Sequence, residues 1–315
     1  MTVGSFLGAC ALDLIFGDPR GVPHPVRGIG RLIEWGERRF AGAWIKQPLA
    51  ARIIGVVAAI GLPAMSYCIV WSAIRAADLL QSGWVVEMLC AFWALAARDL
   101  ADHARSVREA LSRGQIEQAR AAVGLIVGRD TAFLPESEIV RATVETVAES
   151  SCDGIVAPIF FLAIGGAPLA WAYKTVNTLD SMIGHKEAPY RDIGWGSARL
   201  DDVMNWIPAR VTAGLIVIAA GIRFADRHRV LDGGRTLVSE GGKHPSPNSG
   251  RPEAAMAGVL GVRLGGINRY NGRVESRPTI GAARKPLDFH RISEAVTLMW
   301  MASASAVGLA CWIVW

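Results

Sequence analysis

The polar residues best suited to chemistry occur in a short run from Lys174 to Lys186. On a helix, Lys174, Asn177, Asp180 and Ser181 lie close to one face, because they are spaced by three, six and seven residues from the first. A cation, an amide, a carboxylate and a hydroxyl on one face suit a phosphate–metal pair or another polar ligand. A solvated face at the membrane surface is the alternative, and the spacing leaves both open.

Two adjacent carboxylates, Asp201 and Asp202, follow this run. Carboxylate oxygens are typical ligands of Mg²⁺, and together with Asp180 they form the candidate magnesium set. Adjacent aspartates also commonly cap a helix, so the pair alone does not decide between the two roles.

A second segment extends from Lys243 to Glu253 and leads into a stretch predicted to be helical over residues 254–264. Pro252 suits the first turn of that helix. Amide groups at a helix start favour anions, so this segment is predicted to hold a phosphate group through Asn248, Ser249 and Arg251. The alternative is a rigid connector that ends in a helix cap. No Walker A motif occurs.

The stretch 98–153 is helical by pattern, with a helix predicted to begin at Pro135. One face of that helix is apolar and consists of Val140, Val144, Val147 and Ala148. Another is charged and consists of Glu138, Arg141, Glu145 and Glu149. A carboxylate–histidine pair, Asp99 and His103, precedes them; such a pair binds metal or moves a proton, but more often forms an exposed helix ion pair.

The composition predicts a membrane protein, whose helices must position these polar segments. Hydrophobic residues make up 51% of the 315 residues and charged residues only 19%, against about 25% in soluble domains. A disordered or collagen-like chain is excluded. The net charge of +5 is explained by basic membrane loops, so no nucleic-acid partner is expected. The five cysteines form no CxxC motif, which argues against a zinc site or a disulfide framework.

The predicted fold is an all-α, polytopic integral membrane protein that forms a single domain over residues 1–315. A helix needs about 20 apolar residues to cross a bilayer. The expected membrane segments are 1–16, 53–74, 79–97, 154–173, 203–222 and 295–315, and the polar functional stretches are 17–48, 98–153, 174–202 and 223–294. Pro158 and the run Gly165–Pro168 predict that the fourth segment is kinked or re-entrant. Incomplete spans there and at 203–222 place all four polar stretches on the cytoplasmic face.

The ordered set of motifs closely resembles one known family over nearly the whole chain. The motifs are Asp13, Gly17-Asp18-Pro19, His24-Pro25-Val26, Gly128-Arg129-Asp130, Glu145, Glu149, Asp153-Gly154, Ala157-Pro158, Asn177 to Met182, Ala198 to Asp202, Pro208-Ala209-Arg210 and Ser246 to Gly250. Each is weak alone, but their order is specific. Together they resemble the adenosylcobinamide-phosphate synthase family of cobalamin biosynthesis, known as CobD or CbiB.

The resemblance implies a multi-pass enzyme of the bacterial cytoplasmic (inner) membrane with its active site on the cytoplasmic side. Such an enzyme joins (R)-1-amino-2-propanol, or its O-phosphate, to the propionate carboxylate of adenosylcobyric acid in an amide bond, and ATP is hydrolysed. The implied partners are these substrates, the lipid bilayer and other late enzymes of the cobalamin pathway. Magnesium accompanies ATP, the corrinoid is a substrate, and no tightly bound cofactor is expected.

The implied reaction gives the candidate residues their roles. Magnesium is assigned to Asp180, Asp201 and Asp202, and the charge of phosphate or acyl phosphate to Lys174, Lys186, Arg129 and Arg210. The proton of the attacking amine is assigned to Glu145, Glu149 or His244. The remaining substrate- or phosphate-binding candidates are Asp18, His24, Asn177, Ser181, Asn248, Ser249 and Arg251.

Two other classes of protein compete with this interpretation. A transporter or corrinoid-binding permease also has broken membrane segments with charged residues, although the chain has no inverted repeat and its polar stretches are long. A membrane sensor or assembly scaffold is the other class, and for it we expect no ATP turnover and no effect of losing Asp180. Substrate-dependent ATP turnover by the purified protein separates the enzyme from both.

Overall fold

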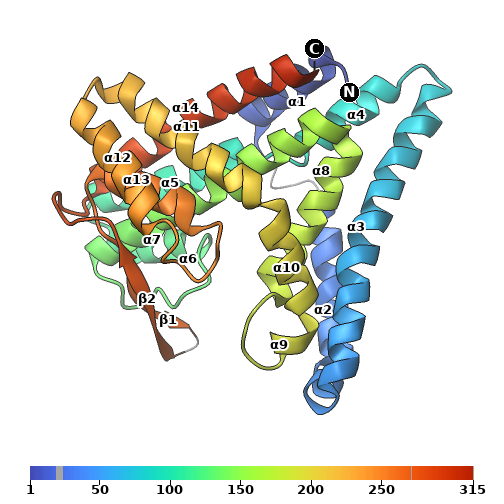
Figure 1. The fold of residues 1–315 in the computed structure, drawn as a ribbon, viewed down its shortest axis with the longest axis horizontal. Coiled ribbons are helices and arrows are strands. Elements are labelled where there is room, and N and C mark those ends of the chain that lie inside the picture. Colours follow the sequence, from blue (N-terminus) through green and yellow to red (C-terminus); the bar gives the residue numbers. More distant parts are fainter. Residues whose placement is uncertain (19–23, 271, 315) are drawn as a thin grey trace. The chain divides into compact units, whose positions relative to one another are not determined.

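A computed structural model describes residues 1–18, 24–270 and 272–314 (Figure 1). Contacts within the chain group it into two compact units. Unit 1 contains α1–α4, α8–α10 and the end of α14, and unit 2 contains α5–α7, a π-helical turn, α11–α13, a β-hairpin and most of α14. The single domain expected from the sequence stays a prediction, and each unit is described by itself.

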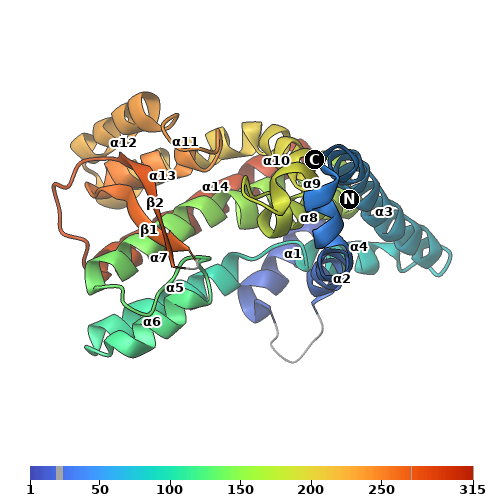
Figure 2. The same ribbon diagram turned by 90° about the horizontal axis from the view of Figure 1, so that it is seen from below.

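Unit 1 is built around two long helices, α3 and α8, that pack against each other. Its helices are α1 (Val3–Phe16), α2 (Pro25–Lys46), α3 (Pro48–Asp78), α4 (Gly83–Phe92), α8 (Ala157–Ile183), α9 (Tyr190–Ile193) and α10 (Trp195–Met204). Pro48 begins α3, where the missing N–H of proline costs no helical hydrogen bond. The amphipathic α2 runs beside α3 (Figures 1 and 2). Ile33 and Trp44 of α2 are buried with Ala51 of α3 and Leu179 of α8.

The long helix α8 is broken where the sequence predicts a kink. Gly166 has a φ of 66°, so two helical segments meet there, and Pro168 follows. A side chain at this φ is strained, which explains the glycine. The predicted membrane segment 154–173 is therefore kinked, and its helix continues ten residues further, to Ile183. The helix ends just before Gly184, as the polar run predicts.

Unit 2 is a helical layer with a two-stranded sheet. Its elements are α5 (Ala97–Ser112), α6 (Ile116–Gly124), α7 (Glu136–Ser150), the π-helical turn η1 (Ser151–Val156), α11 (Trp206–Phe224), α12 (Arg227–Glu240), α13 (Gly250–Leu260), β1 (Leu264–Tyr270), β2 (Arg273–Ile280) and α14 (Phe289–Val314). The helix predicted over 254–264 thus begins and ends four residues earlier. Gly258 allows α13 to pack closely on α12, because a Cβ there would lie 2.8 Å from the Cα of Gly233.

A β-hairpin adds a small sheet to the mainly helical fold. The glycines and asparagines from Gly265 to Gly272 are typical of turn-forming sequence, but β1 and β2 pair antiparallel, with Asn268 opposite Glu275 and Tyr270 opposite Arg273. Gly265 has a positive φ and lies at the irregularity of the pairing between Leu264 and Gly266. Glycine-rich sequence therefore marks the bends of a short sheet here.

Four helices are long and apolar enough to cross a membrane in the described part of the chain. They are Pro48–Asp78, the continuous Glu136–Ile183, Trp206–Phe224 and Phe289–Val314. The fold class predicted from the sequence, a mainly helical polytopic membrane protein, is confirmed with the hairpin as an addition. The expected segment 79–97 contains α4, which has 10 residues and a length of about 15 Å, half of a 30 Å hydrocarbon layer, and its span stays a prediction. The expected segment 1–16 contains a helix of 14 residues, which is also short.

Candidate active site

The charged face of α7 carries the candidate residues of unit 2 that are described first. Glu136 and Glu138 lie in the first turn, where carboxylates are favoured by the helix dipole. The apolar face predicted from the sequence is fully buried. Arg141 and Glu145, on the charged face, are also buried, with exposures of 3% and 8%. A buried charge is stable only when it is paired, and Arg141 and Glu145 form an ion pair with each other.

Glu145 is held by three donors. Its Oε1 accepts hydrogen bonds from Nη1 of Arg141 at 2.9 Å and from the backbone N–H of Gly265 at 2.7 Å. Its Oε2 accepts one from Nη2 of Arg129. These three hydrogen bonds, two of them from guanidinium groups, fix the orientation of the buried carboxylate. Glu145 is therefore better suited to positioning the two arginines than to accepting a proton from an amine.

The β-hairpin completes this arrangement through Asn268, which is 4% exposed. Its Oδ1 accepts hydrogen bonds from Arg129 at 2.6 Å and from Arg141 at 2.9 Å. We refer to Arg129, Glu138, Arg141, Glu145 and Asn268 as the ionic cluster. Sequence reasoning missed Asn268, because it lies in the glycine-rich segment interpreted as a turn.

Glu149 lies one turn beyond Glu145 on α7 and has a different environment. It is partly buried, and the Oγ of Ser249 donates a hydrogen bond to its Oε1 at 2.8 Å. Ser249 lies just before α13, so the predicted phosphate segment meets the charged face of α7 at this contact. Asn248 beside it is buried. Of the candidate proton acceptors, Glu149 has the more accessible carboxylate.

His244 is oriented by its own loop. Its Nδ1 accepts a hydrogen bond from the backbone N–H of Ser246 at 3.0 Å. Burial lowers the pKa of His244, so the ring is neutral near pH 7 and carries its proton on Nε2. The described residues give the buried Nε2 no hydrogen-bond partner. In this tautomer His244 is a hydrogen-bond donor, which argues against its predicted role as a base.

Two further charged residues that sequence reasoning did not select face the same region. Glu253, in the first turn of α13, is 5% exposed, and burial raises its pKa well above 4.5, with the charges of Glu149 and Glu145 adding to the effect. Arg277 of β2 lies with its guanidinium 5.5 Å from the ring centre of Tyr270, and its charge acts on Glu253. The Pro-Glu pair at a helix start was the available signal for Glu253.

Arg251 and Arg210 are the remaining predicted residues of unit 2. The Nε of Arg251 is buried and has no hydrogen-bond partner among the described residues. Arg210 of α11 stacks on the ring of Trp206 at 4.1 Å and donates to its carbonyl at 2.6 Å. The charge of Arg251 acts on Arg210. An anion near Arg251 would satisfy its unpartnered N–H.

The remaining predicted residues belong to unit 1, where α8 and α10 meet. Asp201 is buried, and its two oxygens accept hydrogen bonds from Asn177 at 3.4 Å and Asn205 at 3.0 Å. Tyr173 in turn donates to Asn205 at 2.9 Å. The Oγ of Ser181 donates to the carbonyl of Asn177 at 2.8 Å. The polar face predicted on this helix therefore contacts the predicted carboxylate of α10.

Asp202 lies near two cations, and Asp180 lies against the turn at Gly184. Burial raises the pKa of Asp202, while the charges of Arg199 and the exposed Lys186 act against this shift. Asp180 packs so close to Gly184 that a Cβ at Gly184 would overlap its carboxylate. Among the described residues, no group of three or more His, Cys, Asp or Glu side chains is placed to hold a metal ion. The magnesium assignment stays a prediction.

Asp18 and His24 form a second contact in unit 1, with Nε2 of His24 lying 3.6 Å from Oδ1 of Asp18. Burial lowers the pKa of His24 to about 4, and the nearby charges of Lys174 and Arg27 add to this shift. The ring packs edge-on against Trp93 at 4.9 Å. Pro19, which belongs to the quoted motif, lies outside the described residues.

The two units thus divide the predicted residues. Unit 2 brings together Arg129, Glu145, Glu149, His244, Asn248, Ser249, Arg251 and Arg210. Unit 1 contains Asp18, His24, Lys174, Asn177, Asp180, Ser181, Lys186, Asp201 and Asp202. Asp99 and His103 lie 3.6 Å apart as a partly exposed pair on α5, in agreement with the ion-pair alternative.

Comparison with known proteins identifies relatives over almost the full length of the chain. The family model described as CobD/Cbib protein matches residues 6–299. The Cobalamin biosynthesis protein CobD of Geobacter metallireducens is 46% identical, over 96% of this chain and 94% of its own. CobD of Citrobacter koseri is 44% identical and CbiB of Salmonella typhimurium 43%, each over 98% of this chain and 96% of its own. No solved structure matches the chain.

Proposed function

Because this chain belongs to the CobD/Cbib family, we propose that it is an enzyme of cobalamin biosynthesis that forms an amide bond with the use of ATP. The acid is the propionate of adenosylcobyric acid, and the amine is (R)-1-amino-2-propanol or its O-phosphate. The observation that supports this chemistry best is the pairing of Glu149 with Ser249, beside the ionic cluster and the unpartnered N–H of Arg251.

The reaction needs an activated carboxylate, because a carboxylate and an amine do not condense in water. Transfer of a phosphoryl group from ATP to the propionate yields an acyl phosphate and ADP. Attack by the amine then forms the C–N bond and releases phosphate, while one proton leaves the nitrogen. Cationic side chains stabilise the charge that develops on the phosphate oxygens.

Glu149 is the residue that we assign to the proton. A general base needs an accessible lone pair, and the carboxylate of Glu149 is partly exposed with Ser249 to orient it. Glu145 holds the guanidinium groups of Arg129 and Arg141 in fixed positions beside Glu149. The unpartnered donors of His244 and Arg251 suit a phosphate group, which offers several acceptor oxygens.

We assign magnesium to the face of unit 1 that carries Asp180 and Asp202. The ion prefers oxygen ligands, and it typically uses one or two carboxylates together with phosphates and water. Asp180 and Asp202 would hold it, and Asp201 would orient Asn177 and Asn205 through its two hydrogen bonds. When bound, the ion supplies charge neutralisation of the phosphates.

The decisive experiment measures ATP-dependent amide formation by the purified protein, with adenosylcobyric acid and each amine in turn. Glu149→Gln is expected to lower turnover by about 100-fold, the usual contribution of a general base. Glu136→Gln is the matched control, because Glu136 is exposed at the start of the same helix. Absence of amide product from the unmodified protein with both amines would refute the proposal.

The metal assignment has its own test in the same assay. Asp180→Asn and Asp201→Asn are both expected to reduce amide formation, the first through a lost ligand and the second through disturbed orientation of Asn177. Near-wild-type rates in both variants would remove magnesium from this face while leaving the amide-forming activity intact.

A further inference from the structure

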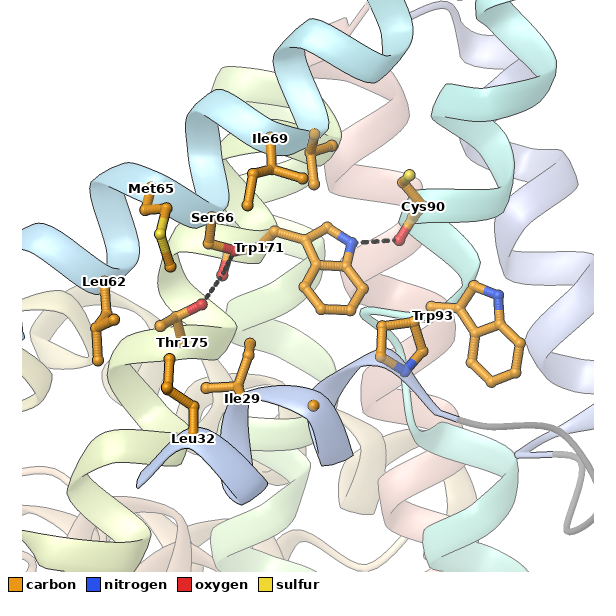
Figure 3. Close-up of a pocket in the computed structure, with 13 residues that line it drawn as sticks. Ile29, Leu32, Leu62, Met65, Ser66, Ile69, Cys90, Trp93, Trp171 and Thr175 are labelled. Atoms are coloured by element: carbon orange, nitrogen blue, oxygen red, sulfur yellow. Dashed lines mark hydrogen bonds between the residues drawn. The ribbon is translucent and has the colours of Figure 1, made fainter. Parts of the chain in front are cut away.

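Unit 1 contains an apolar pocket of about 380 Å³ between α2, α3, α4 and α8 (Figure 3). Leu62, Met65 and Ile69 of α3 form one wall, and Trp171 of α8 faces them. Ile29 of α2 lines another side. The pocket wall contains none of the residues assigned to the proposed reaction, although two of the candidates, His24 and Lys174, are chain neighbours of lining residues.

Most polar groups in the wall already have hydrogen-bond partners within the protein. The indole N–H of Trp171 donates to the carbonyl of Cys90 at 2.8 Å. The carbonyl of Trp171 accepts from Thr175 at 2.8 Å and from Ser66 at 3.4 Å (Figure 3). A polar ligand would lose its hydrogen bonds to water here without replacement, which is costly. The occupant is therefore an apolar chain.

The pocket opens on a surface that suits lipid. Three of its lining residues, Leu32, Met65 and Ile69, are 44%, 47% and 59% exposed, so they lie at the mouth. The same helix α3 is one of the four candidate membrane spans, and large side chains such as Ile53 and Ile60 are more than half exposed on it. An apolar surface of this kind faces acyl chains when the helix spans a bilayer.

Positive charge borders one end of the pocket. Arg27 lies next to the lining residue Gly28 on α2, and Lys174 lies next to the lining residue Thr175 on α8. Their charges both act on His24, which precedes the lining residue Pro25. Asp18 lies 3.6 Å from the same histidine, so two cations stand against one carboxylate here. An apolar pocket with a cationic border matches a molecule that has an acyl chain and an anionic headgroup.

We propose that this pocket binds one acyl chain of an anionic phospholipid of the surrounding membrane, with the lipid phosphate at Arg27. The site is a lipid site in its own right and does not depend on the proposed reaction. Its chemistry distinguishes phosphatidylglycerol from phosphatidylcholine, because only the former carries a net negative charge to meet the cations.

The test uses the whole purified protein, stripped of lipid in detergent and titrated with palmitoyl-oleoyl phosphatidylglycerol or the matching phosphatidylcholine, with bound lipid counted by native mass spectrometry. Gly28→Phe introduces a ring beside the pocket at a position where a Cβ meets no atom within 4 Å. Gly36→Phe is the matched control, since Gly36 lies on the same helix, is equally open and does not line the pocket.

The expected result has three parts. The unmodified protein and Gly36→Phe bind phosphatidylglycerol more tightly than phosphatidylcholine, and Gly28→Phe loses about tenfold in affinity for both. Arg27→Gln lowers the preference for phosphatidylglycerol about fivefold, the effect of one cation near an anionic lipid. Equal lipid binding by Gly28→Phe and Gly36→Phe overturns the proposal. Displacement of the lipid by adenosylcobyric acid also overturns it, because the pocket would then belong to the substrate.

Discussion

Replacement of Asn268 by alanine tests the ionic cluster most directly. The Oδ1 of this residue accepts hydrogen bonds from two guanidinium groups, at 2.6 and 2.9 Å, and it is almost completely buried. Asn268→Ala removes this acceptor, so Arg129 and Arg141 each lose one hydrogen bond. Water has little access to these donors, so the loss is not compensated by solvent.

The loss of stability in Asn268→Ala depends on the hydrogen-bond partners that the two arginines keep. A hydrogen bond to a charged group contributes about 1.5–3 kcal/mol. Arg129 keeps Glu145, and Arg141 keeps Glu138 and the carbonyl of Ile267, so the lower value applies to each bond. The sum is about 3 kcal/mol. At about 2 °C per kcal/mol for a chain of this size, the melting temperature falls by about 6 °C.

The assay is thermal unfolding in detergent, followed by tryptophan fluorescence at one fixed scan rate, because membrane proteins often unfold irreversibly. Asn268→Asp keeps an acceptor oxygen and is expected to retain more stability than alanine. Ser276→Ala, at an exposed position of the same hairpin, is the control. A melting temperature of Asn268→Ala equal to that of Ser276→Ala would refute the view that the hairpin stabilises the two arginines.

Three further predictions concern titration and topology. The pKa of His24 is about 4 in the folded protein and 6.5 for an unperturbed histidine, so its contribution to stability is complete above pH 6.5 and is lost as the pH falls towards 4. His24→Gln is expected to make the melting temperature depend less on pH between 4 and 6.5. Parallel curves of melting temperature against pH for the variant and the unmodified protein would contradict this. The pKa of Glu253 is raised above 4.5, so its contribution is present at low pH and is lost as the pH rises through the raised value. The melting temperature of Glu253→Gln minus that of the unmodified protein is expected to increase with pH, and a decrease would count against the buried neutral acid. Lys186→Cys, in a background without the five native cysteines, is expected to react with a thiol reagent from the cytoplasmic side, and labelling only from the opposite side would reverse the predicted topology.

Local features of the fold were predictable because they depend on near neighbours in the chain. Apolar length identifies α3 and α14, and the Gly-Pro run predicts the kink at Gly166. The 3.6-residue period predicts the two faces of α7. Apolar composition alone did not predict the short α4, because its segment ends in the turn after Phe92 and is followed by α5 of unit 2.

Pairing across the chain was not predictable from spacing. Arg129 and Asn268 are 139 residues apart, and Glu149 and Ser249 are 100 residues apart. Periodicity states which face of an element is polar, but not which other element meets that face. The hairpin added a second difficulty, since glycines with positive φ are equally typical of a turn and of an irregular strand.

The two glutamates of α7 show why residue type and spacing leave the role of a carboxylate open. Glu145 and Glu149 are one helical turn apart and belong to the same charged face, so the sequence assigns them the same chemistry. In the fold, Glu145 accepts hydrogen bonds from two arginines and a backbone amide, whereas Glu149 meets a serine at the start of another helix. The first environment is buried and uses the carboxylate to hold two cations, whereas the second leaves the carboxylate partly exposed. Loss of the Glu145 carboxylate should therefore reduce stability and disturb the arginines, whereas loss of the Glu149 carboxylate should reduce turnover in a protein that still folds.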